Sequence, residues 1–309
     1  MSQEPAQPHS AEYLADYRDF WWNQDFLALM SRRWDLGAAA TVLDVGCGHG
    51  HWGRTLLPHL APDARLTGID PEPKWVEKAS ETAKEKSLAD RTRYLEGRAE
   101  QIPFPDDSFD LVTCQTVLMH VPDPAAAIRE MIRVLRPGGR VFAAEPSNAA
   151  NSMIRISTRL NESVDERMRL VRFQAILEHG KARLGKGDSS IGDQLPGLFA
   201  AAGLDQVQVY LSDRSCPLIP PYTGRGQRAL IDQVLKWADK DIWIWDRDET
   251  LPCYLAGGGD EHEFEALWQQ AMKVTRDEAQ AMREGTFVSS GGAMTFLVSG
   301  IKPGAARSQ

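Results

Sequence analysis

Cysteine is scarce in this sequence, and the cysteines that it has lie far apart. The 309 residues include four of them, with no C-x-x-C pair. Zinc sites and disulfide frameworks need cysteines at close, regular spacing. We therefore expect reduced thiols and no bound metal at Cys47, Cys114, Cys216 and Cys253.

Long apolar runs are also missing. No segment approaches the roughly 20 apolar residues that a membrane-spanning helix needs, and no apolar stretch typical of a signal peptide follows Met1. We therefore expect a cytoplasmic protein that has no membrane partner.

An excess of positive charge is missing as well. The formal net charge is −8, and the basic residues of Arg155–Arg172 alternate with acids, which is typical of solvated helix faces. Because nucleic acids need a basic face, a nucleic-acid partner is not expected. The 42% hydrophobic and 25% charged residues are typical of a globular protein, and the length suffices for one α/β domain with a substantial addition.

The segment Thr41–Gly53, TVLDVGCGHGHWG, is the most informative part of the chain. An apolar β run is followed by the alternating glycines Gly46, Gly48 and Gly50 and then by a helix-like segment. This order is typical of a nucleotide cradle. Glycine permits positive φ and close approach of a ligand, and the first N–H groups of a helix can bind polar ligand atoms.

Two kinds of nucleotide ligand are compatible with the residues of this segment. Gly48–Gly53 matches the dinucleotide pattern G-x-G-x-x-G, although a lone match is weak evidence. The other spacing, Asp44-x-Gly46-x-Gly48-x-Gly50, places an acid at the end of the strand. A carboxylate there would repel a pyrophosphate but would suit an ammonium group. This spacing resembles the first motif of class I S-adenosylmethionine-dependent methyltransferases, [DE]-x-G-x-G-x-G. The resemblance implies that S-adenosylmethionine binds at Asp44, Gly46, Cys47, Gly48 and Gly50.

A second acid follows at the distance expected for a βαβ unit. The β run Ala64–Asp70 ends 26 positions beyond Asp44, where such units place a carboxylate that accepts hydrogen bonds from ribose hydroxyls. The alternative is a helix N-cap ahead of Pro71. The resemblance favours Asp70 and Pro71 as part of the cofactor site.

A third motif lies in Gly97–Pro124 and resembles methyltransferases of the ubiquinone-biosynthesis type. That type carries G-D-A-x-x-L-P-F, then F-D-x-V and L-x-H-V-x-D; the matching residues here are Gly97, Ala99, Ile102–Phe104, Phe109–Asp110, Val112 and Leu118–Asp123. Arg98 replaces the aspartate that usually contacts the adenine amino group, and arginine offers no acceptor. The contact would then shift to Glu100 or to the backbone of Ala99, or Arg98 would stack on the ring. Gln115 is a further cofactor-binding candidate.

The phrase R-V-L-R-P-G-G ends a predicted helix at Asp123–Leu135 and turns the chain into a strand at Arg140–Glu145. This turn is common in these methyltransferases and is not expected in nicotinamide dehydrogenases. The resemblance covers about Val42–Pro146. It implies an α/β, Rossmann-like fold with a seven-stranded, mostly parallel sheet. The last strand, predicted at Ala293–Ile301, should be an antiparallel edge strand.

The rest of the chain is predicted to add helices to this core. Apolar residues at helical spacing predict one amphipathic helix over Ala11–Trp34, which either covers the edge of the core or acts as a lid with Tyr13, Tyr17 or Trp22 on the cofactor. The later insertions would shape a substrate pocket, although the second could instead mainly form a dimer contact. The expected parts are an N-terminal helical lid (1–36), the cofactor-binding core (37–147), a helical insertion (148–187), a continuation of the core (188–214), a second insertion (215–291) and the last core strand with the tail (292–309).

For methyl transfer, the protein must align the acceptor with the methyl donor and exclude water, and the acceptor must present a lone pair. An alcohol, phenol or ammonium acceptor must also lose a proton. His120, in the L-x-H-V position, and Glu145 are the candidate catalytic residues, although a histidine in that position is more often structural. Cys47, His49 and His51 could suggest a metal, but they lie in the turn that the cofactor needs.

The sequence thus predicts a methyltransferase acting on a small-molecule acceptor, as a monomer or a homodimer. Oxygen is the favoured acceptor atom because it is common in the family; nitrogen, carbon or a peptide end are alternatives. A non-catalytic scaffold that binds the cofactor is a second class of function. A nicotinamide oxidoreductase is a third, disfavoured by Asp44 and the Pro-Gly-Gly turn.

Overall fold

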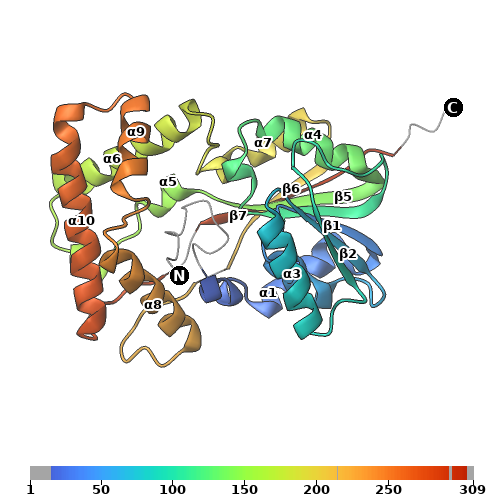
Figure 1. Cartoon of the computed structure of the whole chain (residues 1–309), viewed down its shortest axis with the longest axis horizontal. Helices are drawn as coiled ribbons and strands as arrows, with labels where there is room; N and C mark the ends of the chain where they lie inside the picture. Colours follow the sequence, from blue (N-terminus) through green and yellow to red (C-terminus); the bar gives the residue numbers. More distant parts are fainter. Residues whose placement is uncertain (1–14, 214, 292–293, 305–309) are drawn as a thin grey trace. The chain divides into compact units, whose positions relative to one another are not determined.

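The computed structural model describes residues 15–213, 215–291 and 294–304, which fall into two compact units (Figure 1). The first, here called the sheet unit, contains the described residues of 22–147, 190–213 and 295–304. The second, the helical unit, contains those of 15–21, 148–189 and 215–294.

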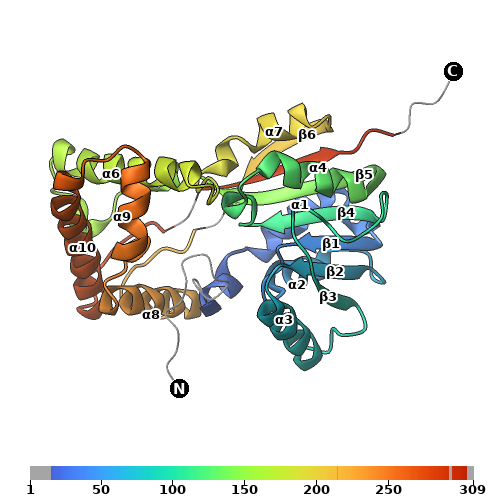
Figure 2. The same ribbon diagram turned by 45° about the horizontal axis from the view of Figure 1, so that its top comes forward.

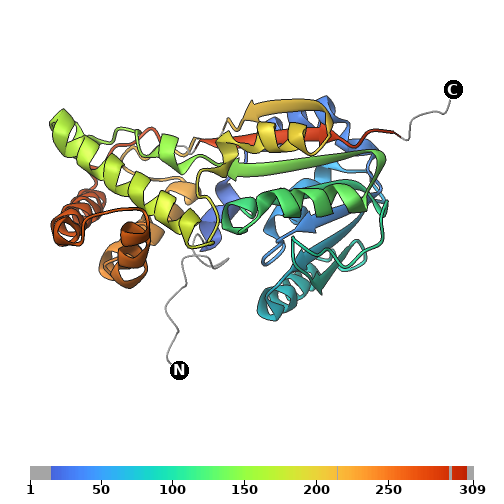
Figure 3. The same ribbon diagram turned by 90° about the horizontal axis from the view of Figure 1, so that it is seen from above.

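The sheet unit holds a seven-stranded sheet of order β3-β2-β1-β4-β5-β7-β6. Neighbours among β1 to β5 pair in parallel, and β7 pairs antiparallel with both β5 and β6. The predicted fold class is confirmed, but the predicted edge position of the last strand is wrong: β7 lies between β5 and β6 (Figure 3). The strands are β1 Thr41–Val45, β2 Arg65–Asp70, β3 Thr92–Glu96, β4 Phe109–Gln115, β5 Leu135–Pro146, β6 Asp205–Leu211 and β7 Thr295–Ile301.

Helices cover both faces of this sheet (Figure 1). The central strands are accordingly apolar on both faces: Val42, Leu43 and Val45 of β1 are all fully buried. Helices α4 and α7 pack on one face in a continuous apolar cluster with β1, β4 and β5. The bounds are α1 Gln24–Trp34, α2 His51–Leu56 and α3 Pro73–Glu85 on one face, and α4 Pro124–Val134 and α7 Leu195–Ala201 on the other.

Register places the candidate residues at one edge of the sheet. Asp44 of β1 is paired with Gly68 of β2 and with Thr113 of β4. Because these strands are parallel, their carboxyl ends meet at the same edge. The residues that follow β1, β2 and β4 are therefore neighbours, as expected for a ligand site of an α/β sheet.

The helical unit combines the two inserted segments around its own apolar core (Figure 2). Phe173 of α6 packs against Tyr254 and Phe264, with ring centroids 5.2 and 6.0 Å away. None of the helices in the described ranges has the length and apolar composition needed to cross a membrane. The helices are η1 Ala15–Phe20, α5 Asn148–Asn151, α6 Val164–Arg183, α8 Arg225–Asp239, α9 Arg247–Ala256 and α10 Glu261–Arg283.

The N-terminal segment differs from its prediction. A short 3-10 helix at Ala15–Phe20 and the separate helix α1 replace the single helix expected over Ala11–Trp34. The boundary between the units falls after Trp21, so residues 22–36 belong to the sheet unit, and the lid expected over residues 1–36 stays a prediction. Residues 1–14, including Tyr13, lie outside the described part of the chain.

Candidate functional site

The glycine turn after β1 has the backbone that its sequence predicts. Gly46, Gly48 and Gly50 have φ values of +65°, +50° and +76°, a region that favours glycine. A Cβ atom on Gly46 would lie 2.5 Å from Cγ2 of Val117, and one on Gly50 would lie 2.7 Å from the hydroxyl oxygen of Tyr94. Backbone conformation and space both require glycine at these two positions.

Three amide groups of this turn are bonded within the chain itself. Cys47 N–H donates to the carbonyl oxygen of Ile69 (2.9 Å), Gly48 N–H to Oδ2 of Asp70 (2.9 Å) and Gly50 N–H to the carbonyl oxygen of Cys47 (2.8 Å). These three amides precede α2, so the expectation that the first N–H groups of the helix bind polar ligand atoms stays a prediction.

Asp44 carries the most informative polar atom of the site. Its side chain is 1% exposed, and Oδ2 accepts a hydrogen bond from Gly53 N–H at 2.9 Å. Oδ1 is buried and has no hydrogen-bond partner among the described residues. Burial, reinforced by Asp70, raises the pKa of Asp44 from 3.8 to about 7 against the opposing effects of Gly53 N–H and Arg54. Such an acceptor needs a donor, and a cationic donor would suit it best.

Asp70, at the end of β2, is 7% exposed and stabilises the turn. Its carboxylate accepts hydrogen bonds from Gly48 N–H and from Glu72 N–H (3.0 Å), while burial raises its pKa. The alternative role of Asp70 as a helix N-cap is wrong, because Glu72 is the residue that precedes α3. Each carboxylate oxygen can accept a second hydrogen bond. Pro71 follows as an exposed residue.

The segment after β3 lies at the same edge, since Gly97 N–H donates to the carbonyl oxygen of Asp70 at 3.1 Å. Ala99 is buried, and Glu100 is half-buried. Nη2 of Arg98 lies 3.6 Å from Oε1 of Glu100, and the Arg98 side chain is 65% exposed. An exposed pair of this kind contributes little to stability, so Glu100 can change partners at low cost.

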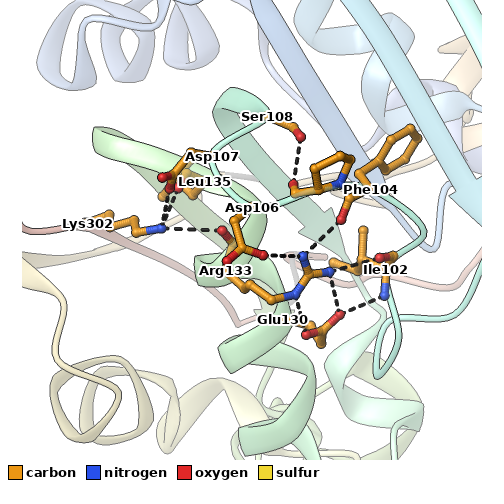
Figure 4. Close-up of polar contacts among 10 residues, drawn as sticks. Ile102, Phe104, Asp106, Asp107, Ser108, Glu130, Arg133, Leu135 and Lys302 are labelled. Carbon is orange, nitrogen blue, oxygen red and sulfur yellow. Dashed lines mark hydrogen bonds and ion pairs between the residues drawn. The ribbon is translucent and has the colours of Figure 1, made fainter.

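The loop that follows is anchored by Arg133 of α4 (Figure 4). Its guanidinium donates to the carbonyl oxygens of Ile102 and Phe104, both at 2.9 Å, and forms ion pairs with Asp106 (2.8 Å) and Glu130 (2.7 Å). These contacts anchor the part of the third motif that precedes β4 to α4.

Gln115 and His120 mark the carboxyl end of β4. Gln115 is the last residue of the strand, and its Nε2 is buried without a hydrogen-bond partner in the described part of the chain. His120 ends the 3-10 helix η4, Leu118–His120, where it is half-buried. Gln115 thus offers an amide donor at the end of β4, and His120 offers an imidazole in the segment that follows it.

Glu145 is placed differently from an acid that contacts an acceptor. It is 0% exposed, and its carboxylate accepts hydrogen bonds from the backbone N–H groups of Val117, Leu118 and Met119. Burial raises its pKa to about 7, against the effect of these hydrogen bonds. A carboxylate enclosed by backbone amides cannot reach an acceptor, so the predicted catalytic contact of Glu145 is not supported.

The Cys47, His49 and His51 group shows no metal-binding arrangement. Cys47 is 6% exposed, and burial followed by the charges of Asp44 and Asp70 raises the pKa of its thiol. Among the described residues, no three His, Cys, Asp or Glu side chains are grouped so that they could hold a metal ion.

The two predicted aromatic contacts fall in different units. Trp22 belongs to the sheet unit, where its ring centroid lies 5.0 Å from that of Trp52 and 6.4 Å from that of Phe26. Tyr17 is buried in the helical unit, so its contact with a cofactor stays a prediction.

Three residues around the turn were not singled out from the sequence. Val117 and Tyr94 fill the space beside Gly46 and Gly50, and a Cβ atom on Gly68 would lie 2.6 Å from Cδ1 of Tyr94. A glycine inside the β run Ala64–Asp70 is a signal of close packing that could have identified this contact.

Comparison with known proteins places residues 43–143 in the methyltransferase domain family. An uncharacterized methyltransferase of Bacillus subtilis is 37% identical over 140 residues, covering 45% of this chain and 53% of that protein. A demethylmenaquinone methyltransferase of Listeria welshimeri is 34% identical over 126 residues, covering 41% and 51%. The chain thus spans about half the length of these relatives.

Solved structures extend the similarity of fold. The YcgJ protein of Bacillus subtilis covers 92% of this chain and 100% of its own, with a TM-score of 0.50 and 21% identity. A putative methyltransferase of Bacillus halodurans covers 90% and 98%, with a TM-score of 0.51 and 19% identity. At such identities the likeness concerns the fold alone. Residues 43–143 of this chain match the model of the methyltransferase domain family, and the sheet built around them is similar in fold to a solved structure of a putative methyltransferase.

Proposed function

We propose that this chain is an S-adenosylmethionine-dependent methyltransferase that acts on a small-molecule acceptor. The observation that carries the proposal is Oδ1 of Asp44, which is buried beside the glycine turn and has no hydrogen-bond partner in the part of the chain that the structure describes. S-adenosylmethionine carries an ammonium group and no phosphate. A turn beside a carboxylate oxygen that has no partner among the described residues, and with three of its amides already bonded, suits such a ligand better than a pyrophosphate.

The residues at this edge fit the parts of the cofactor in order. Asp44 would accept from the ammonium group, Asp70 from the ribose hydroxyls, and Glu100 or the backbone of Ala99 from the adenine amino group. Gln115 would donate its Nε2–H to the amino-acid end. When bound, S-adenosylmethionine supplies a methyl group activated by a sulfonium. The chain then has to hold the acceptor in line with it and exclude water.

Oxygen is the favoured acceptor atom in this proposal, with His120 as the candidate for removing its proton. His120 supports this because it ends η4, in the segment that follows β4, and its side chain is only half-buried. Methylation of nitrogen, carbon or a peptide end would use the same cofactor site. A cytoplasmic monomer or homodimer without nucleic-acid or membrane partners completes the proposal.

Isothermal calorimetry with S-adenosylhomocysteine, the reaction product, tests the cofactor. We expect micromolar binding that weakens about tenfold or more in Asp44→Asn, since the amide cannot offer a charged acceptor. Asp110→Asn is the matched control, because Asp110 accepts from Thr41 N–H (2.8 Å) at the opposite, amino-terminal edge. Binding of a nicotinamide dinucleotide in place of S-adenosylhomocysteine would overturn the proposal.

Turnover needs its own test. The protein with S-adenosylmethionine would be incubated with panels of phenols, carboxylic acids, amines and short peptides, and products would be read as the mass gain of one methyl group. Methylation that is lost in Asp44→Asn and kept in Asp110→Asn supports an enzyme. Cofactor binding without any methylated product favours the scaffold.

A further inference from the structure

The chain leaves β4 through an unusual residue. Thr116 has a φ of +53°, a conformation that costs free energy in a β-branched residue and tends to be kept at functional sites. Its N–H donates to the carbonyl oxygen of Ala144 at 3.0 Å, which continues the pairing with β5. The chain then turns so that residues 117–120 run along the carboxyl edge of the sheet.

The next three backbone amides all donate to one side chain, Glu145. Oε1 accepts from Val117 N–H (2.8 Å) and Leu118 N–H (2.9 Å), and Oε2 accepts from Met119 N–H (3.3 Å). The thiol of Cys114 adds a contact of 3.8 Å to Oε1. Each of these four groups is a donor, so the ionised carboxylate fits them and can satisfy amides that the first turn of η4 leaves without partners.

Residues 117–120, which Glu145 holds in this way, contact the glycine turn and carry His120. The side chain of Val117 occupies the space that a Cβ atom on Gly46 would fill, so it forms a wall of the glycine turn. His120 N–H donates to the carbonyl oxygen of Val117 at 2.9 Å and closes the 3-10 turn that carries the imidazole. A shift of this segment would move the wall and the imidazole together.

We propose that Glu145 is a positioning residue of the methyl-transfer site, whose carboxylate fixes residues 117–120 and through them both the glycine turn and His120. The inference rests on the proposed function for the site that it serves. Glu145 contacts neither cofactor nor acceptor. This positioning role takes the place of the catalytic role that the sequence suggested for Glu145.

The test uses Glu145→Gln in the full chain, with Asp110→Asn as the matched control. Glutamine keeps one acceptor oxygen but turns an NH₂ donor toward a backbone N–H. Asp110→Asn makes the same change in a carboxylate that binds backbone amides of Thr41 and Ala40 at the other edge. We expect Glu145→Gln to weaken S-adenosylhomocysteine binding about tenfold and Asp110→Asn to leave it within about twofold.

The imidazole of His120 gives a second readout, which general destabilisation would not change. Its titration is followed by NMR and assigned with His120→Gln. We expect Glu145→Gln, and not Asp110→Asn, to displace the midpoint and to speed hydrogen exchange at the amides of 117–119. Equal effects of the two variants on both readouts would overturn the inference.

Two additions keep the test decisive. If Glu145→Gln does not fold, Glu145→Asp retains the charge, withdraws it by one methylene, and should change the same readouts in the same direction. If the wild-type protein fails to bind S-adenosylhomocysteine, the proposed function is wrong. The titration of His120 and the exchange of the three amides still decide whether Glu145 fixes the segment.

Discussion

The two oxygens of Asp44 have different surroundings, and this difference accounts for much of the site's chemistry. One is bonded to Gly53 N–H, and the other is buried without a partner in the described part of the chain. Burial disfavours the charged form of this carboxyl group and raises its pKa to about 7. A cationic ligand would favour the ionised form, so binding and proton release should be linked.

The affinity for S-adenosylhomocysteine should therefore depend on pH. We expect the dissociation constant to fall by up to about tenfold per unit between pH 5.5 and 7, because only ionised Asp44 pairs with the ammonium group, and to level off above pH 7. Calorimetry across this range checks the expectation. Asp44→Asn should bind weakly with a flat profile, whereas a wild-type affinity that does not change with pH would contradict it.

The same carboxyl should make the ligand-free protein less stable at higher pH. The folded pKa of Asp44, about 7, exceeds its ordinary value of 3.8. Its contribution to the free energy of unfolding is thus fully present below pH 3.8 and is lost as pH rises through 7. Melting temperatures should fall between pH 5 and 8, and fall less in Asp44→Asn. An equal fall in both proteins would assign the effect to other groups, such as Glu145.

Gly46 should tolerate no side chain. We expect Gly46→Ala to cost about 1–3 kcal/mol from its positive φ alone and to lose S-adenosylhomocysteine binding, because the new Cβ would displace Val117. Gly203→Ala is the matched control: φ is +82°, but no atom lies within 4 Å of the added Cβ. Thermal unfolding measures the cost of backbone strain, and calorimetry measures the loss of binding caused by displacement of Val117. Equal loss of binding in Gly46→Ala and Gly203→Ala would contradict a role of Val117 in shaping the glycine turn.

At the scale of elements, one arginine and one lysine hold the loop before β4 (Figure 4). Arg133 binds two loop carbonyls, and its hydrogen bond holds the pKa of Glu130 below the usual range. Lys302, just after β7, donates to Asp107 and to the carbonyl oxygen of Leu135, both at 2.7 Å. The loop is thus fixed by residues from α4 and from the end of the chain.

Replacing Arg133 should release this loop. We expect Arg133→Met to lower the free energy of unfolding by about 1–3 kcal/mol, because two carbonyls lose a donor, and to speed hydrogen exchange in residues 102–108. Arg129→Met is the control, since Arg129 makes only an exposed contact of 3.8 Å with Asp123 and should change stability by less than about 1 kcal/mol. Equal losses of unfolding free energy in the two variants would show that the contacts of Arg133 contribute no more to stability than an exposed ion pair does.

At the scale of the whole molecule, each unit has an apolar core of its own. The core of the sheet unit lies between the sheet and helices α4 and α7, and that of the helical unit lies among α6, α9 and α10. In the helical unit, α6 and α9 approach closely through glycine: a Cβ atom on Gly180 would lie 1.6 Å from the carbonyl oxygen of Cys253. That distance leaves no room for a methyl group.

Gly180→Ala should therefore destabilise the helical unit in particular. Overpacking of this kind costs about 1–3 kcal/mol or more, and hydrogen exchange should accelerate in α6 and α9 more than in β1 and β4. Gly185→Ala is the control, with a positive φ of +69° and nothing within 4 Å of the added Cβ. Uniform acceleration in both units would mean that they unfold as one.

The sequence alone was enough for most of the core. The glycine spacing predicted the turn because positive φ is a local property, and the helix expected at Asp123–Leu135 is α4, Pro124–Val134. The single helix over Ala11–Trp34 was wrong, because apolar spacing continues across the break between η1 and α1. The position of β7 was wrong because strand order depends on pairing between distant segments.

The sequence by itself determined the class of the fold, the glycine turn and the acids at the ends of β1 and β2, because φ preference, apolar periodicity and motif spacing act over short stretches of chain. Only the tertiary structure decided which partner each polar group has. It gave the amide of Gly48 to Asp70, left one oxygen of Asp44 without a partner in the described residues, and enclosed Glu145 among three amides. Hydrogen bonds and burial depend on distances between residues far apart in the chain, and these distances exist only once the strands have paired.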